Sequence, residues 1–176
     1  RLMVIRVLVP FAVFSALLAT YSGYWLYLSS NLEETIHRLS SHWHGAGIKV
    51  EYGELSVGGY PYRLEITASD VKASGLTTTV AWNWRTPVLR AIAHPWKLSH
   101  WVTVFESPSE IELDLASNWA AALKAGRGRM SVILGPDELL ERVSLDFRDL
   151  RVQPNMGSDY ADISRFQVHF RRGTPL

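Results

Sequence analysis

The sequence predicts an α+β protein that is mainly β, and two observations predict it. An apolar run without Asp, Glu, Lys or Arg extends from Val7 to Leu28. From Ile48 onward apolar residues alternate with polar ones, which is the period of β-strands with one buried face. We therefore expect an N-terminal transmembrane helix that continues into a short stalk. A curved, mostly antiparallel β-sheet domain with short helices follows. The expected segments are a membrane anchor (1–30), an amphipathic helical stalk (31–46) and a β-rich extracytoplasmic domain (47–176), the last cut short at its C-terminus.

The anchor has the length and the flanking residues of a membrane span. As a helix, Val7–Leu28 would measure about 33 Å, which matches a bilayer core. Four aromatic residues, Tyr21, Tyr24, Trp25 and Tyr27, gather toward its second end, where such rings favour the headgroup layer. A cleaved signal peptide is the alternative, but it needs a shorter apolar run and a small-x-small cleavage site.

The charges that flank the run predict its orientation. Arg1 and Arg6 lie on one side, whereas Glu33 and Glu34 follow on the other. The positive-inside rule then places the N-terminus in the cytoplasm and the domain in the periplasm, on an inner (plasma) membrane crossed once. Beyond the span, Asn31 can cap a stalk helix whose apolar residues recur at helical spacing until Gly45 and Gly47.

The domain itself is predicted to consist of strands joined by turns. Gly58-Gly59-Tyr60-Pro61 is a turn signal between the strand patterns 52–57 and 62–66, which predicts a hairpin or a tight corner of the sheet. Later strands are expected at Thr77–Trp84, Leu98–Glu106, Ser109–Ala116, Met130–Leu134, Val143–Val152 and Ile163–Arg171. Short helices are expected at Pro87–Ala93, Trp119–Ala125 and Pro136–Glu141.

The two stretches 64–73 and 143–152 share one pattern, apolar-x-apolar-x-apolar-x-Asp-apolar-x-apolar. In both, the alternation slips by one residue at the aspartate, Asp70 or Asp149. A β-bulge produces such a slip and bends the strand. A third copy begins near Ile163. The pattern favours a long, curved sheet.

Composition excludes several classes of function. Lys and Arg number 18 and Asp and Glu 17, and without Arg1 and Arg6 the remainder is near neutral, so no basic face for nucleic acid is expected. The chain has no Cys, which removes disulfides and thiolate metal sites. His42 and His44 point apart on a helix, so with His37 they form no metal site. We expect no cofactor.

Catalytic motifs are equally scarce. Ser69 and Lys72 have the Ser-x-x-Lys spacing, but a strand pattern places them on opposite faces, away from the helix start that this chemistry needs. Basic residues at 124–129 are interpreted as a solvated turn before the strand at Met130, with an anion-binding loop as the alternative. The tryptophans are more informative. Core packing explains each one singly, but as a set they are candidate ligand-binding residues that could line an apolar groove or meet the membrane interface: Trp82, Trp84, Trp96, Trp101 and Trp119.

Three stretches carry a resemblance to a known family: 21–27, the Gly53-x-Leu55-x-Val57-x-Gly59-x-Pro61-x-Arg63-Leu64 segment, and Trp82-x-Trp84 with 93–96. They resemble an alphaproteobacterial family of membrane-anchored proteins, Domain of Unknown Function 2125, which is distantly similar to AsmA-like envelope proteins. The resemblance implies a sheet that shelters lipid and implies no catalytic residues.

Two functional hypotheses follow. The first is a non-enzymatic envelope protein that contacts the lipid bilayer and binds lipid or another envelope protein through the apolar face of its sheet. The second is an extracytoplasmic hydrolase whose site is assembled from scattered residues. A concave apolar surface favours the first, whereas a pocket with His94, His100 or His169 hydrogen-bonded beside an acid favours the second.

Overall fold

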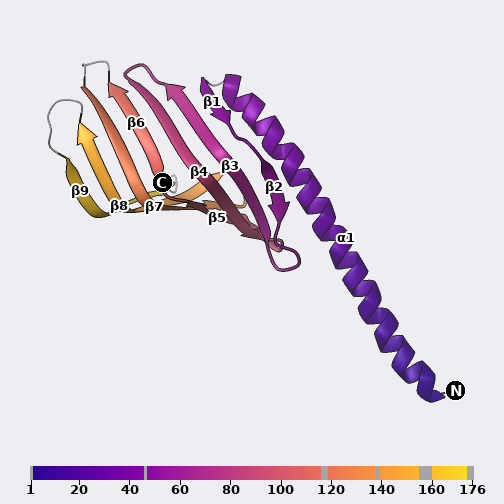
Figure 1. Cartoon of the computed structure of the whole chain (residues 1–176). Helices are drawn as coiled ribbons and strands as arrows, with labels where there is room; N and C mark the ends of the chain where they lie inside the picture. The colour runs from indigo at the N-terminus through magenta and orange to yellow at the C-terminus, as the bar shows by residue number, and fades with distance from the viewer. Residues whose placement is uncertain (1, 46, 116–118, 138, 155–159, 174–176) are drawn as a thin grey trace.

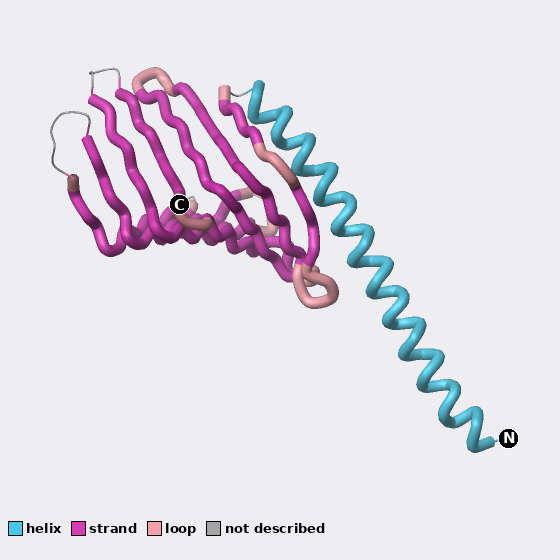
Figure 2. Tube along the Cα trace, viewed as in Figure 1, coloured by secondary structure: helices cyan, strands magenta, loops and turns pink. Residues whose placement is uncertain are grey.

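A computed structural model describes residues 2–45, 47–115, 119–137, 139–154 and 160–173 of the chain. One long helix, α1 (Leu2–Gly45), is followed by nine strands that form a single sheet. Figure 1 shows α1 as a rod beside one edge of a strongly curved sheet, and Figure 2 shows that loops are confined to the strand ends and to breaks within strands. The predicted fold class is therefore confirmed.

The helix is continuous from the predicted anchor through the predicted stalk. Asn31, expected to cap a new helix, lies inside α1, where its side-chain Nδ2 donates to the Tyr27 carbonyl 2.9 Å away. An amide that bonds the preceding turn of its own helix does not interrupt the helix. The helix ends at Gly45, and Gly47 has a φ of 78°, the left-handed conformation that glycine adopts readily.

All strand pairs are antiparallel, in the order β1-β3-β4-β5-β7-β8-β9, with β2 beside β3 and β6 between β4 and β7. The strands are β1 (Ile48–Glu51), β2 (Leu55–Gly58), β3 (Leu64–Leu76), β4 (Val80–His94), β5 (Lys97–Phe105), β6 (Ser109–Leu115), β7 (Trp119–Leu134), β8 (Leu140–Pro154) and β9 (Ala161–Arg171).

The expected short helices at Pro87–Ala93 and Trp119–Ala125 are wrong, because these residues belong to β4 and β7. Both segments are rich in residues that favour helix, yet each pairs with strands on both sides. Pairing on both edges outweighs a weak local preference. Pro136–Glu141 is not a helix in its described residues either: Gly135 N–H donates to the Leu139 carbonyl in a turn, and β8 begins at Leu140. Residue 138 lies outside the described residues.

Alternation along the strands separates an apolar face from a polar one. In β3, Leu64, Ile66 and Ala68 are buried on one face, and the residues between them, such as Glu65, point to the other. Because paired residues in a sheet point to the same face, the register extends this division to the neighbouring strands. Leu64 pairs with Ala93, and Ile66 pairs with Ala91.

The predicted slip at Asp70 and Asp149 is confirmed, but the expected extra residue of a bulge is absent from these strands. Both aspartates have positive φ, 48° and 53°, a conformation that Asp tolerates better than most residues. The register is unchanged across the slip, since Ser69 pairs with Val88 and Val71 with Thr86. The partner strand therefore slips at the same point, and the sheet bends without losing its pairing.

This bend crosses the whole sheet, and we call the positions where it crosses each strand the bend line. It passes through Gly53 between β1 and β2, through Asp70, through Pro87, through the break between β5 and β6, and through Gly126 opposite Asp149. Rings from the two sides of the line meet on the apolar face: the Trp84 and Phe105 ring centroids are 5.1 Å apart at 85°. The apolar face is thus the inside of the bend.

At one end of the sheet, a tight turn joins β2 to β3 at the predicted Gly58–Pro61 signal. Gly59 has a φ of 98°, and Arg63 N–H donates to its carbonyl at 3.1 Å. A Cβ on Gly59 would lie 2.8 Å from the Arg63 carbonyl oxygen, whereas a Cβ on Gly58 would meet nothing within 4 Å. The turn therefore requires glycine at 59 and not at 58.

We expect Gly59→Val to lower the free energy of unfolding by about 2 kcal/mol or more, because it combines backbone strain with a clash. Gly58→Val is the matched control and should unfold near the wild-type midpoint. Denaturant unfolding of the purified variants, followed by tryptophan fluorescence, measures both. Equal loss of stability in the two variants would contradict this account of the turn.

Candidate functional site: the concave apolar face

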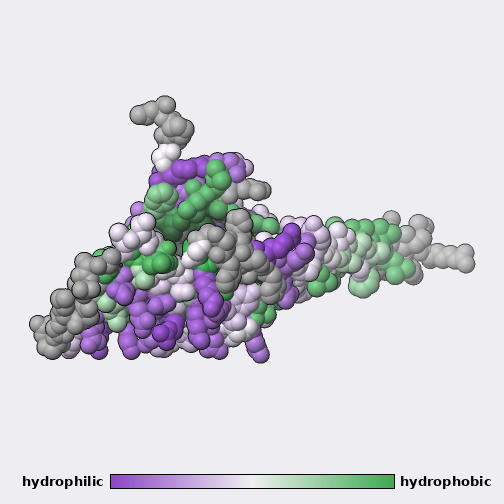
Figure 3. All heavy atoms as spheres, turned by 90° about the horizontal axis from the view of Figure 1, so that it is seen from above, coloured by the Kyte–Doolittle hydropathy of each residue, from purple (hydrophilic) through white to green (hydrophobic). Residues whose placement is uncertain are grey.

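The inside of the bend presents one continuous apolar surface, which we call the concave face. Figure 3 shows apolar residues gathered in the hollow of the sheet, with hydrophilic residues on its outer side. By register, the concave face has contributions from strands β1 to β9, for example Ile66 on β3 and Leu150 on β8. Its buried apolar members include Leu64, Ile66, Ala68, Val71, Ala73, Ala93, Phe105, Ala121, Ala125 and Leu150.

Aromatic rings form the middle of this face. Phe105 on β5 and Phe147 on β8 stack with centroids 6.4 Å apart and planes at 16°, although β7 lies between their strands. The intervening residue is Gly128, where a Cβ would lie 2.7 Å from Phe105 and 2.9 Å from Phe147. On the other side of Phe105 lies Trp84, whose Nε1–H donates to Ser109 Oγ at 2.8 Å. The missing side chain at 128 thus lets two rings from non-adjacent strands meet.

The face is open toward β9. On this strand Phe166, Val168 and Phe170 pair with the apolar residues of β8 and share their face. Their side chains are between 40% and 55% exposed. Among the described residues no element packs over them. A single-layer sheet normally needs a second layer over its apolar side, so this flank is an uncovered apolar surface.

The predicted tryptophans divide between this face and other places. Trp82, Trp84 and Trp101 share the concave face by register, with Trp82 against Gly75 and Trp101 paired to Val132. Trp96 lies instead at the β4–β5 turn and is exposed. The side chain of Trp119 lies outside the described residues. Sequence reasoning missed the phenylalanines and Val168, although their alternation in β8 and β9 was visible.

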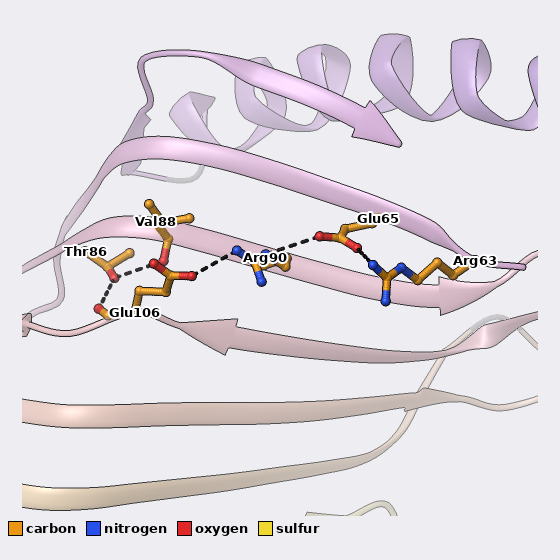
Figure 4. A network of polar contacts seen from close by, with 6 residues as sticks. All are labelled: Arg63, Glu65, Thr86, Val88, Arg90 and Glu106. Carbon is orange, nitrogen blue, oxygen red and sulfur yellow. Dashed lines mark hydrogen bonds and ion pairs between the residues drawn. The ribbon is translucent and has the colours of Figure 1, made fainter. Parts of the chain in front are cut away.

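The outer face is polar and carries cross-strand ion pairs. Figure 4 shows a chain of contacts on it: Arg63 pairs with Glu65 at 2.8 Å, and Arg90 lies 3.2 Å from Glu65 and 3.0 Å from Glu106. The Arg90 Nε contact with Glu65 is an ion contact outside hydrogen-bond geometry. At the bend line, Thr86 Oγ1 donates to the Glu106 carbonyl at 3.1 Å. The network ties β3, β4 and the end of β5 together.

Two outer-face carboxylates have lowered pKa values. A hydrogen bond from Arg165 is the main cause for Asp146, and a hydrogen bond from Lys124 is the main cause for Glu110. Both carboxylates therefore remain ionised at neutral pH, which suits ion pairing and not proton donation to a substrate. Lys124 was expected in a turn, but the segment 124–129 is the middle of β7, so that expectation is wrong.

Among the described side chains, His94, His100, His169 and Ser69 do not form an assembled catalytic group. His100 is hydrogen-bonded to Ser131 at 3.1 Å, His169 to Ser144 at 3.0 Å, and His94 to the Tyr62 carbonyl at 3.3 Å. In the part of the chain that the structure describes, none of these rings bonds a carboxylate. The slip at Asp70 brings Ser69 and Lys72 to the same outer face, which corrects the expectation of opposite faces, but Ser69 Oγ accepts from Glu54 N–H at 2.9 Å.

Metal ligands are also not gathered. Among the described residues, no group of three His, Asp or Glu side chains is placed to hold a metal ion. The side chains of His37, His42 and His44 lie outside that part of the chain. A recess of about 600 Å³ at the bend line, beside Lys124, Asp149 and Arg151, is open. The concave face is therefore the strongest candidate site.

Comparison with known protein families shows which family the chain belongs to. Residues 25–176 match the family described as an uncharacterized protein conserved in bacteria, Domain of Unknown Function 2125. The chain belongs to this family. No curated protein and no solved structure matches the chain. The match begins at Trp25, so the Domain of Unknown Function 2125 region includes the second half of α1 together with the whole sheet.

Proposed function

We propose that this protein is a non-enzymatic, membrane-anchored envelope protein that binds lipid acyl chains along the concave face. The observation that carries the proposal is the open flank of that face, where Phe166, Val168 and Phe170 of β9 are exposed to solvent. Exposed apolar surface is costly in water, and contiguous apolar patches on proteins commonly mark interaction sites. The resemblance to AsmA-like envelope proteins agrees with a lipid as the occupant.

Membrane anchoring is supported by α1. Its segment Leu8–Ile36 is long and apolar enough to cross a bilayer. The large apolar residues from Leu8 to Leu18 project outward and are at least half exposed, as expected of residues that face lipid. A signal sequence can also form an apolar N-terminal helix of this kind. However, α1 continues without a break to Gly45, and Trp25 Nε1–H donates to the Arg63 carbonyl at 3.0 Å. Cleavage of a signal sequence would remove part of this helix, whereas an uncleaved anchor keeps the helix and its contacts with the sheet.

The location proposed for the domain is the periplasm, with α1 in the inner membrane and its N-terminus in the cytoplasm. The support is the charge pattern around the span, Arg1 and Arg6 before it and Glu33 and Glu34 after it. Basic residues are retained on the cytoplasmic side of a span.

Replacing both Ala12 and Leu17 by Arg should release the protein from membranes. Each charge in the bilayer core costs roughly 2.5 kcal/mol or more on insertion scales. The matched control is Thr78→Arg with Thr79→Arg, which adds the same two charges on the exposed turn between β3 and β4. Membrane flotation of cell lysates is the measurement, and unchanged flotation of the first variant would disprove anchoring by α1.

A reporter enzyme that is active only outside the cytoplasm, fused after Leu176, should be active in cells. A second reporter that is active only in the cytoplasm should be silent at the same position. The reverse pattern of activities would show that the topology is inverted.

Lipid should co-purify with the protein in mild detergent and should depend on the concave face. We expect Val168→Glu to reduce the lipid recovered by extraction and mass spectrometry, because it places a charge on the open flank. Gln167→Glu introduces the same charge on the same strand but on the outer face, near Arg165, and should leave lipid recovery unchanged. Equal recovery from both variants would rule out the concave face as the lipid site.

A further inference from the structure

Two turns at one end of the sheet carry exposed aromatic and basic side chains, which together we call the aromatic tip. Tyr60 and Tyr62 lie between β2 and β3, whereas Trp96 lies between β4 and β5 and is followed by Lys97. Tyr62 is 75% exposed and Trp96 is 67% exposed. Neither turn contains an acidic residue: their sequences are Gly59-Tyr-Pro-Tyr-Arg63 and His94-Pro-Trp-Lys-Leu98.

The two turns are held together as one surface. His94 Nδ1 donates to the Tyr62 carbonyl at 3.3 Å, and its ring stacks on Trp96 with centroids 5.0 Å apart. Exposed large aromatic rings are expensive in water when nothing in the sheet covers them. Fixed in place beside one another, they form a preorganised surface and not a pair of mobile loops.

Hydrogen bonds attach this surface to a defined level of α1. Tyr21 Oη donates to the Pro61 carbonyl. Tyr24 Oη donates to the Pro95 carbonyl at 3.1 Å, and Trp25 Nε1–H donates to the Arg63 carbonyl at 3.0 Å. In addition, Ser22 Oγ and Tyr60 Oη are hydrogen-bonded at 2.8 Å. Both turns are thus tied to one stretch of the helix, Tyr21–Trp25.

That level coincides with the end of the apolar part of the helix. From Leu8 to Leu18 the described side chains are apolar and outward-facing apart from the small Ser15. As a helix, Leu2–Thr20 measures about 28 Å, close to the thickness of the hydrocarbon core. Its one charged residue, Arg6, lies about 6 Å from the N-terminal end of this stretch, and arginine side chains this close to a helix end extend into the headgroup layer. Tyr21, Tyr24 and Trp25 then fall at the headgroup layer, where amphipathic rings and basic side chains are favoured.

We propose that the aromatic tip lies in the headgroup layer of the same bilayer that α1 crosses, so that the sheet contacts the membrane at a second place. The ligand is a lipid surface, bound by Tyr62, Trp96 and Lys97. This proposal rests on the membrane anchoring proposed above. It shortens the membrane-crossing part of α1 to about residue 20, compared with the expected anchor of 1–30.

The absence of Cys from the sequence makes a single-site label possible. Tyr62→Cys and Lys97→Cys each place a nitrobenzoxadiazole dye on one turn of the tip. Thr78→Cys is the matched control, because it places the dye on the exposed β3–β4 turn at the opposite end of the sheet. The full-length variants are reconstituted into vesicles of phosphatidylcholine and phosphatidylglycerol, with and without lipid brominated near the headgroup.

We expect brominated lipid to quench the dye at positions 62 and 97 and to leave the dye at 78 unquenched, with blue-shifted emission at the tip only. Flotation of the same samples separates the two proposals. Protein that floats with the vesicles but shows no quenching at either tip position overturns the tip proposal while anchoring stands. Protein that fails to float overturns both. Quenching at 62, 97 and 78 alike would show that the whole sheet lies on the membrane, which also contradicts a tip-only contact.

Discussion

In the part of the chain that the structure describes, no second layer covers the apolar side of the sheet, and the bend that shields this side is the constraint on which the rest of the structure depends. Within the described residues the shielding comes from the two sides of the bend line, where Trp84 meets Phe105. Along each strand the apolar residues change from odd to even positions, or the reverse, where the strand crosses the bend line. The bend requires neighbouring strands to make this change at paired positions. Asp70 and Asp149 allow this with positive φ, and Gly126 leaves room for Asp149, because a Cβ there would lie 3.0 Å from the Asp149 Cβ.

Much of this arrangement could be predicted from the sequence because the bend has a local signature. A slip in alternation at an aspartate is visible in a single strand, and it appears in both β3 and β8. The hairpin at Gly59 and the end of the helix just before Gly47 are equally local, since Gly59 and Gly47 both adopt positive φ. What could not be predicted depends on partners: the strand state of Pro87–Ala93 and Trp119–Ala125 follows from pairing on both edges, which a helix-favouring segment does not reveal.

In the candidate site, too, some features could be predicted from the sequence and others depend on strand pairing. Tryptophans stood out by their number, yet register shows that Trp82, Trp84 and Trp101 share a face that Trp96 does not. Phe105 and Phe147 lie on strands that do not neighbour each other, and their contact depends on the absence of a side chain at Gly128. No property of the individual sequence segments indicates such a contact. The apolar character of the face was predictable, whereas its aromatic centre required the strand order.

The attachment of the sheet near the middle of one unbroken helix has a mechanical consequence. Tyr21–Gly45 extends about 37 Å beyond the level of attachment, at ~1.5 Å per residue. With α1 in a bilayer as proposed, this segment amplifies any tilt of the helix. A tilt of about 20°, typical of membrane helices, would displace the C-terminal end of α1 sideways by roughly 13 Å. Because Tyr21, Tyr24 and Trp25 bond the sheet to the helix, the sheet turns with it. Local bilayer thickness, which contributes to helix tilt, would thereby influence the direction in which the hollow of the sheet faces.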